Sequence, residues 1–212
     1  GNLRLNVSRK KTIVTTSSST LTKKLRAKLG KHGIAVKSKV KMLGIDFSCG
    51  KIAARSAQRS RVMSVDSRRS KYARLGKRAA GRLVKAGAAP AMQYGACVYG
   101  TPNTTLKKVR GFACAVKGEM RGRSTFARLE LARFDPGAAC AISPIVEWAR
   151  AIWDSTAKCE DLRVVWQRAH TLIASSPTPF RHVAGPGGAM LASCRRIGWK
   201  WPSFDAILRA DG

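Results

Sequence analysis

The sequence predicts an α+β fold that is mainly α-helical, with a small antiparallel β element at the N-terminus followed by helices. Alternating and β-branched segments occur within the first 47 residues, which favours strands there. Through most of the remaining chain, apolar residues recur at helical spacing. With 212 residues, of which 44% are hydrophobic, the chain is long enough to bury a core. We therefore expect a folded protein and not a disordered basic tail.

The β element is expected to form from three segments. Residues 3–7 alternate apolar and polar side chains, and residues 12–16 are rich in β-branched side chains, so these two segments should pair. A short helix should start near Ser17–Ser19, where a hydroxyl can cap it, and end at Gly30 or three residues later. Three leucines at four-residue intervals give that helix one apolar stripe. Residues 36–47 then return to strand character.

Residues 51–86 are the most basic stretch, and they predict a helix with two distinct faces. On a helix one band about 80° wide is cationic and comprises Lys71, Arg74, Arg78, Arg82 and Lys85. A neighbouring band is apolar and comprises Tyr72, Leu75, Ala79, Leu83 and Ala86. No acid occurs between Asp66 and Glu119, whereas a merely soluble helix usually mixes both signs of charge. We therefore interpret the cationic band as a track that contacts phosphates.

Further helices are predicted along the second half of the chain. Pro102–Thr105 opens one of them. Its apolar face comprises Leu106, Val109, Ala113 and Val116. Residues 118–128 are expected to form a basic loop. Beyond Asp135–Gly137 three amphipathic helices are predicted, with Gly185–Gly188 as a turn before the third, and Ser203 should cap a last short helix.

Charge divides the chain into two unequal parts. The formal net charge is +30, from 41 Lys and Arg residues against 11 Asp and Glu. Residues 1–128 hold 31 basic and three acidic residues, which gives +28, whereas residues 129–212 hold ten basic and eight acidic residues, which gives +2. A chain this basic attracts polyanions, so nucleic acid is the first candidate partner and an anionic membrane surface a distant second. A free-standing enzyme for small molecules fits this charge poorly.

The spacing of cysteine, histidine and acidic residues argues against a metal or catalytic site. The six cysteines lie at least 17 residues apart, which excludes zinc-ribbon spacing and favours reduced thiols in a core. The three histidines are isolated, and the one adjacent acidic pair, Glu160 and Asp161, suits the start of a helix. No signal peptide and no membrane span are predicted. Because Gly1 is not a methionine, we expect a fragment or a processed chain. Reduced thiols favour an intracellular protein, and the basic start suits a nuclear and a mitochondrial protein equally.

Three regions are expected: residues 1–50 with the β element, residues 51–133 with basic helices, and residues 134–212 with a C-terminal helical region. No catalytic residue, cofactor or metal ligand is predicted. Basic residues of the first two regions are the candidates for contact with nucleic-acid phosphates, which position a nucleic acid without reading its bases. They are Arg9, Lys10, Lys11, Lys41, Arg68, Arg69, Lys71, Arg74, Arg78, Arg82, Lys85, Lys107, Lys108, Arg110, Arg121 and Arg123.

Three segments, in their order and spacing, resemble the reverse transcriptases of non-LTR retrotransposons. Leu3–Val7 with Lys10–Val14 resembles the motif of the late palm in which Lys-Thr follows a strand. Val40–Phe47 resembles the primer-grip hairpin, and Ala89–Gly100 resembles the thumb segment, where a proline precedes Tyr-Gly and an aromatic residue. The resemblance covers about residues 1–130, and the rest is similar to the helical region that follows the thumb.

This resemblance implies a primer grip and a helical thumb that hold a template–primer duplex through its backbone. The family's catalytic carboxylates precede the first matching motif and are absent here, so the motif lysine, at Lys11, has no metal site to assist. We expect a nucleic-acid-binding protein, for RNA foremost, that derives from or belongs to such an enzyme and has no polymerase activity alone. The alternatives are an RNA-binding component of a ribonucleoprotein such as a mitochondrial ribosome, the C-terminal portion of an active RNA-directed DNA polymerase, and an unrelated basic adaptor.

Overall fold

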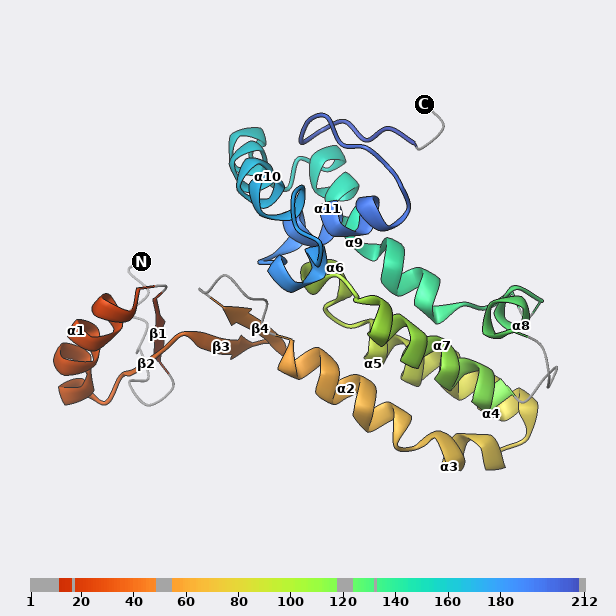
Figure 1. Cartoon of the computed structure of the whole chain (residues 1–212). Helices are drawn as coiled ribbons and strands as arrows, with labels where there is room; N and C mark the ends of the chain where they lie inside the picture. Colours follow the sequence, from red (N-terminus) through yellow and green to blue (C-terminus); the bar gives the residue numbers. More distant parts are fainter. Residues whose placement is uncertain (1–11, 17, 49–54, 118–123, 132, 210–212) are drawn as a thin grey trace, which may run out of the picture.

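The computed structural model describes residues 12–16, 18–48, 55–117, 124–131 and 133–209. Within these ranges the fold is α+β and mainly helical, as the sequence predicts. Figure 1 shows the strands and the first helix at one end of the molecule, beside a larger body of helices in which the C-terminal helices lie uppermost.

The first strand pairs with a segment other than its predicted partner. β1 (Ile13–Thr15) lies parallel to β2 (Ala35–Lys37), and α1 (Ser19–Leu29) connects the two strands. The expected partner, residues 3–7, lies outside the described residues. The helix begins as predicted, because the Ser18 hydroxyl accepts a hydrogen bond from the N–H three residues later at 3.3 Å. No residue of α1 is buried, so its leucine stripe is only partly covered.

A hairpin leads from this β unit into the helices. It comprises β3 (Lys39–Met42) and β4 (Ile45–Ser48), which pair antiparallel. Its two-residue turn has positive φ angles at Leu43 (48°) and Gly44 (76°), as tight hairpin turns require. The Arg61 guanidinium donates a hydrogen bond to the Gly44 carbonyl at 2.7 Å, which fastens the turn to the helical body.

Helices make up most of the remaining described chain. Before residue 118 they are α2 (Ser56–Asp66), α3 (Arg69–Arg74), α4 (Lys77–Leu83), the π-helix η2 (Val84–Ala88), α5 (Ala89–Gln93), α6 (Ala96–Tyr99) and α7 (Asn103–Lys117). After it they are α8 (Thr125–Leu131), α9 (Pro136–Trp153), α10 (Cys159–Ile173) and α11 (Pro186–Arg196), and two short 3-10 helices are η1 (Gly30–His32) and η3 (Pro179–His182). α7 packs against α2, α3, α4, α8 and α9, so it is the central helix of the basic region.

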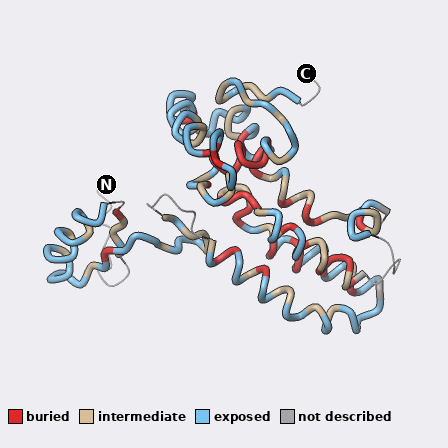
Figure 2. Tube along the Cα trace, viewed as in Figure 1, coloured by how far each residue is buried: buried red, intermediate tan, exposed pale blue. Residues whose placement is uncertain are grey.

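Two buried clusters organise these helices, and both are visible as red segments in Figure 2. The first comprises Val62, Ala80, Val84, Ala88, Met92, Ala96, Leu106, Val109, Phe112, Val116 and Cys140. The second comprises Ile145, Trp148, Leu162, Ile173, Val183, Ala189, Met190, Leu191, Ala192 and Cys194. The predicted apolar face of α7 is confirmed, since its residues are buried in or beside the first cluster. α9 contributes to both clusters and joins the two halves of the helical body.

The continuous helix predicted over residues 71–85 is wrong. α3 ends at Arg74, and Leu75 and Gly76 are extended, with ψ of 145° at both, before α4 begins. The Leu75 N–H closes a final tight turn on the Tyr72 carbonyl at 3.2 Å. A glycine inside a helical pattern lowers helix stability, and here the chain uses it to change direction.

The break also changes which face of this segment packs against the core. The buried residues beyond the break are Ala80, Val84 and Ala88, at four-residue intervals. The residues of the predicted apolar band that are exposed instead are Leu75, Ala79, Leu83 and Ala86. Tyr72, before the break, is half-buried and packs edge-on against Phe112 with 5.5 Å between ring centroids. The predicted band is therefore correct before the break and displaced after it.

Gly185–Gly188 begins a helix and does not form the predicted turn. Pro186 is the first residue of α11, a position that suits proline because its missing N–H is not needed there. A Cβ at Gly187 would lie 2.8 Å from a methyl carbon of Val165, so the glycine permits close packing of α11 against α10. The glycines thus serve helix packing.

Two further predictions need correction. No helix starts at Ser203 in the described residues, where Lys200 and Leu208 instead form an antiparallel bridge through hydrogen bonds of 2.9 and 2.8 Å. The predicted basic loop over residues 118–128 is wrong for its last residues, which belong to α8. Residues 118–123 lie outside the described part of the chain.

Candidate nucleic-acid interface

Exposed cations on α3, α4 and η2 form the first part of the candidate interface. The predicted track residues Lys71, Arg74, Arg78, Arg82 and Lys85 are all exposed. None of them takes part in the ion pairs that the described residues form. The extended residues 75–76 divide the five cations between two short helices, so the track is not the single straight band that the sequence predicts.

The other predicted residues differ in their partners. Those that are exposed and have no ion pair within the described chain are Lys41, Arg68, Lys107 and Lys108. Arg69 pairs with Asp66 at 2.5 Å, and Arg110 pairs with Asp135 at 2.7 Å. These two arginines are partly neutralised, and Arg110 fastens α7 to the start of α9. Those that lie outside the described residues are Arg9, Lys10, Lys11, Arg121 and Arg123.

A groove between α2 and the first turns of α7 forms the second part of the candidate interface. It consists of a cavity of about 820 Å³ and an adjoining cavity of about 380 Å³. Polar side chains that line it are Arg59, Ser60 and Ser64 from α2 and Thr104, Thr105 and Lys108 from α7. Among the described residues, no Asp or Glu lines either cavity. The groove therefore combines hydroxyl groups with positive charge.

Three other arginines fix segments that are distant in sequence, through bonds to backbone carbonyls. The acceptors are the carbonyls of Tyr99 and Phe180 for Arg55, of Ile173 and Ser176 for Arg195, and of Thr101 for Arg196. Burial lowers the pKa of Arg55 to about 10. Burial, with a smaller contribution from the charge of Arg110, lowers the pKa of Arg196 to about 10. Arg55 and Arg196 thus join the two halves of the helical body, whereas the exposed Arg195 ties α11 to the end of α10.

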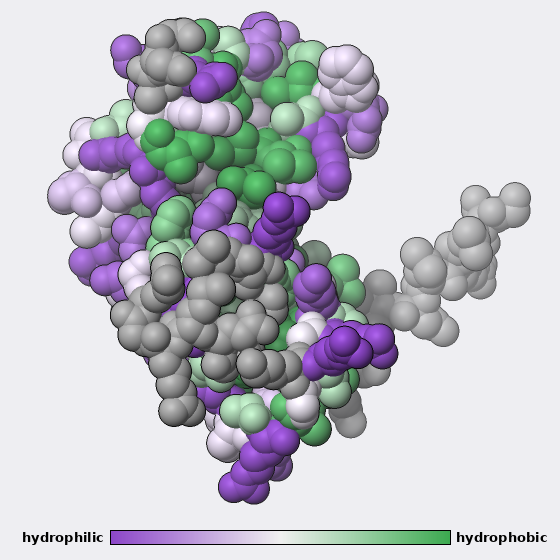
Figure 3. Space-filling view, turned by 90° about the vertical axis from the view of Figure 1, so that its right-hand side faces the viewer, coloured by the Kyte–Doolittle hydropathy of each residue, from purple (hydrophilic) through white to green (hydrophobic). Residues whose placement is uncertain are grey.

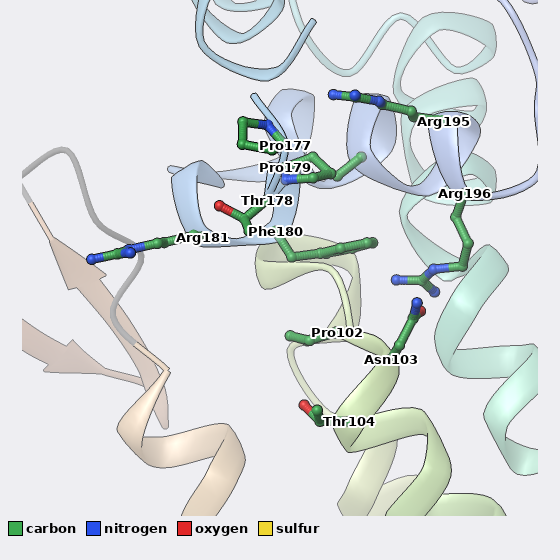
Figure 4. Close-up of a pocket in the computed structure, with 11 residues that line it drawn as sticks. Pro102, Asn103, Thr104, Pro177, Thr178, Pro179, Phe180, Arg181, Arg195 and Arg196 are labelled. Carbon is green, nitrogen blue, oxygen red and sulfur yellow. The ribbon is translucent and has the colours of Figure 1, made fainter. Parts of the chain in front are cut away.

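A third cavity, of about 520 Å³, lies where α7 begins and η3 and α11 meet it (Figure 4). Arg181, Arg195 and Arg196 line it, but their guanidinium groups point in different directions. The Arg196 guanidinium lies over the Phe180 ring, 4.1 Å from its centroid, and beside Asn103, while Arg181 points away. The arginines do not converge on one point, so this cavity lacks the geometry of an anion site.

The histidine and cysteine side chains of the described residues do not gather into a metal-binding cluster. No group of three or more His, Cys, Asp and Glu side chains that could hold a metal occurs in the part of the chain that the structure describes. His170 stacks on Trp166 with 4.9 Å between ring centroids. Cys140 and Cys194 are buried, and burial raises the pKa of each thiol to about 12. Cys159 is exposed on α10, so the prediction that all cysteines lie in a core is wrong for this residue.

One helix also exposes apolar side chains. Ile142, Val146 and Trp153 lie on α9 at helical spacing, and Trp153 is 89% exposed. Figure 3 shows a band of hydrophobic side chains across the upper part of one face of the molecule, with hydrophilic side chains around it. None of the described helices combines the length and hydrophobicity that a membrane crossing requires.

The sequence prediction missed the groove residues other than Lys108. Arg59 was not singled out, although it lies in the same acid-poor stretch as the predicted track. Serines 56, 60 and 64 recur every four residues, which places them on one face of a helix, and this spacing is the signal that could have identified one wall. The opposite wall could not be found in this way, because α7 lies some forty residues further along the chain.

Comparison with known proteins gives no relative: no protein-family model matches the chain, and no curated protein and no solved structure matches it.

Proposed function

We propose that this chain binds nucleic acid, RNA foremost, through the phosphate backbone, and that it has no polymerase activity on its own. The observation that carries the proposal is the set of exposed cations on α3, α4, η2 and α7 that form no ion pair with another described residue, in a stretch of sequence without an acid from Asp66 to Glu119. Neutralising phosphates with Lys and Arg releases counterions, which favours binding without any base-specific contact.

Two structural observations support more specific versions of this function. The β3–β4 hairpin, after which the next described element is a helix, suits the resemblance to a primer grip and thumb, and this favours the C-terminal portion of a reverse transcriptase. The exposed apolar side chains of α9 favour a protein neighbour, as a component of a ribonucleoprotein would have. In both versions this chain contributes RNA binding through its basic region.

Charge reversal on the track tests the proposed function. The variant Arg74→Glu, Arg78→Glu, Arg82→Glu should lower the affinity for a single-stranded RNA by about 100-fold or more near physiological salt, because three phosphate contacts become repulsive. The slope of log affinity against log salt should become shallower by about 2 to 3. Fluorescence anisotropy with a labelled oligonucleotide at several salt concentrations measures both quantities.

A matched control separates the track from the net charge. Lys158→Glu, Arg168→Glu, Lys200→Glu changes three exposed cations outside the basic region and alters the net charge by the same amount. This control should keep most of the affinity. Equal losses in the two triple variants, or binding by the unaltered chain that hardly depends on salt, would refute the proposed interface.

A further inference from the structure

We propose that the groove between α2 and α7 holds the sugar–phosphate backbone of single-stranded RNA and prefers ribose to deoxyribose. The inference rests on the proposed function and names the form of nucleic acid and the place where it binds. The sequence alone does not distinguish RNA from DNA, whereas the lining of the groove does.

The shape of the groove suits a single strand. Its two cavities share Arg59, Met63, Thr104 and Thr105, so they form one continuous channel beside α7. α2 and α7 pack against each other. Packed helices have axes about 8 to 10 Å apart, and a channel along such a pair is too narrow for a duplex. A sugar–phosphate strand can lie along it.

Hydroxyl groups on both walls give the groove its preference for ribose. Ser60 on α2 and Thr104 and Thr105 on α7 make no side-chain hydrogen bond to another described residue. A hydroxyl can both donate and accept a hydrogen bond, and so can the ribose 2′-OH. Deoxyribose lacks this partner, so DNA would leave these hydroxyls without the bonds that RNA supplies.

Positive charge on each wall supplies the phosphate contacts. Arg59 and Lys108 are exposed, line the same cavity from opposite helices and form no ion pair with described residues. At one end of the groove Asp46 accepts hydrogen bonds from the hydroxyl of Ser56, which lines the groove, at 3.0 Å and from the Ala57 N–H at 2.6 Å. That carboxylate is engaged at the start of α2 and leaves the interior of the groove positive.

The floor of the groove offers an apolar surface beside these polar groups. Met63 is half-exposed there, and a methionine side chain adapts to the face of a sugar or base. Gln58, only 2% exposed, also lines the groove, and its amide donates to the Gly100 carbonyl at 3.5 Å. The groove thus has a formed lining and is not an open helical face.

Three probes of one sequence test the inference with the unaltered chain: single-stranded RNA, single-stranded DNA and 2′-O-methyl RNA. At a single salt concentration we expect RNA to bind roughly ten-fold more tightly than DNA, because one or more hydrogen bonds to the 2′-OH are lost in DNA. The 2′-O-methyl RNA should bind like DNA, since it has no 2′-OH donor. Equal affinity for all three probes would overturn the inference even if all three bind.

A hydroxyl-deficient variant tests the location. Ser60→Ala, Thr104→Val, Thr105→Val should bring RNA affinity down to the DNA level and leave DNA affinity unchanged. Thr20→Val, Ser70→Ala, Thr125→Val removes the same number of exposed hydroxyls from α1, α3 and α8 and should keep the RNA preference. Arg59→Gln, Lys108→Gln should lower affinity for both probes equally.

The outcomes distinguish failure of this inference from failure of the proposed function. If no nucleic acid binds the unaltered chain at low salt, the proposed function fails. If RNA and DNA bind but the groove variants behave like their control, only the groove assignment fails. Circular dichroism checks the fold of each variant, and the single change Thr104→Val, with the 2′-O-methyl probe, replaces the triple variant if that variant does not fold.

Discussion

The two helical cores of this molecule use arginine in opposite ways. Around the first core, in α3 and α4, Arg74, Arg78 and Arg82 stand in solvent without ion pairs among the described residues. At the second core, Arg195 and Arg196 bond to backbone carbonyls, and Arg196 is also partly withdrawn from water. The difference teaches that a count of basic residues measures attraction to nucleic acid only where the charges are exposed.

The packing of the two cores differs in a related way. The first core contains several alanines, Ala80, Ala88 and Ala96, among its larger side chains. The second core contains larger groups, with Trp148 and Leu191 at its centre and further tryptophans at its edge. Its arginines contribute to the folded structure by joining loops to α11.

The largest expected difference is between the reactivities of buried and exposed cysteine thiols. Thiol labelling also tests whether the two cores exclude solvent to the same extent. Burial raises the pKa of Cys140, in the first core, and of Cys194, in the second, from 9.0 to about 12. At pH 8 the fraction of each side chain present as reactive thiolate is then about 1000-fold smaller than for a thiol with a pKa of 9.0. This fraction should rise about ten-fold per pH unit. Among the described cysteines, a maleimide reagent should modify the exposed Cys159 first, as measured by mass spectrometry.

The same labelling in low denaturant sharpens the comparison. If the cores open together, Cys140 and Cys194 become reactive at the same denaturant concentration. If one of these cysteines is labelled while the other stays protected, the core of the labelled cysteine opens independently. That result would contradict a single helical body joined by α9.

Two leucine truncations give the next largest effect. Leu191→Ala should lower the unfolding free energy of the protein by about 2 to 5 kcal/mol, because Leu191 is fully buried in the second core and its truncation leaves a cavity. Leu83→Ala should cost about 0.5 kcal/mol or less, because Leu83 is 49% exposed on α4. Urea denaturation followed by circular dichroism measures both. A large loss of unfolding free energy in Leu83→Ala would show that Leu83 is buried, as the apolar band predicted from the sequence requires.

Two arginine variants have the smallest expected effects on stability. One should lower stability and the other should weaken RNA binding. Arg195→Ala removes hydrogen bonds of 2.8 and 2.6 Å to the carbonyls of Ile173 and Ser176 and should cost about 1.5 to 3 kcal/mol of unfolding free energy. Arg78→Ala should change stability by about 0.5 kcal/mol at most and weaken RNA binding. If Arg195→Ala weakens RNA binding as much as Arg78→Ala in the folded protein, the division of roles between the two cores is wrong.

Sequence reasoning predicted the elements whose signals are local. The helix beginning after Ser18 and the long helix α7 were predicted because a capping residue and a sustained apolar period coincide there. The break at Leu75–Gly76 was missed because the apolar spacing continues across it and a single glycine is a weak signal for a helix end. The packing face of α4 was then displaced with it.

Part of the candidate site could be predicted from the sequence, and part could not. Exposed cations could be predicted, because missing acids are visible in the sequence. The groove could not be predicted, since it exists only where α2 and α7 pack together, and the hydroxyl groups of Ser60 and Thr104 carry no charge that marks them in the sequence. Ion pairs such as that between Arg110 and Asp135 likewise depend on contacts across the fold.

The hydrogen bond from Arg55 to the Phe180 carbonyl has a consequence for the order of folding during synthesis. The two residues are 125 positions apart in the chain. While the ribosome is still making the C-terminal helices, Arg55, which precedes α2, can bond to the Tyr99 carbonyl but lacks this second acceptor. Domains usually fold as they emerge, N-terminal part first. In this chain the basic helices can collapse early, but Arg55, which lines the groove, gains its second bond only when the last third of the polypeptide arrives.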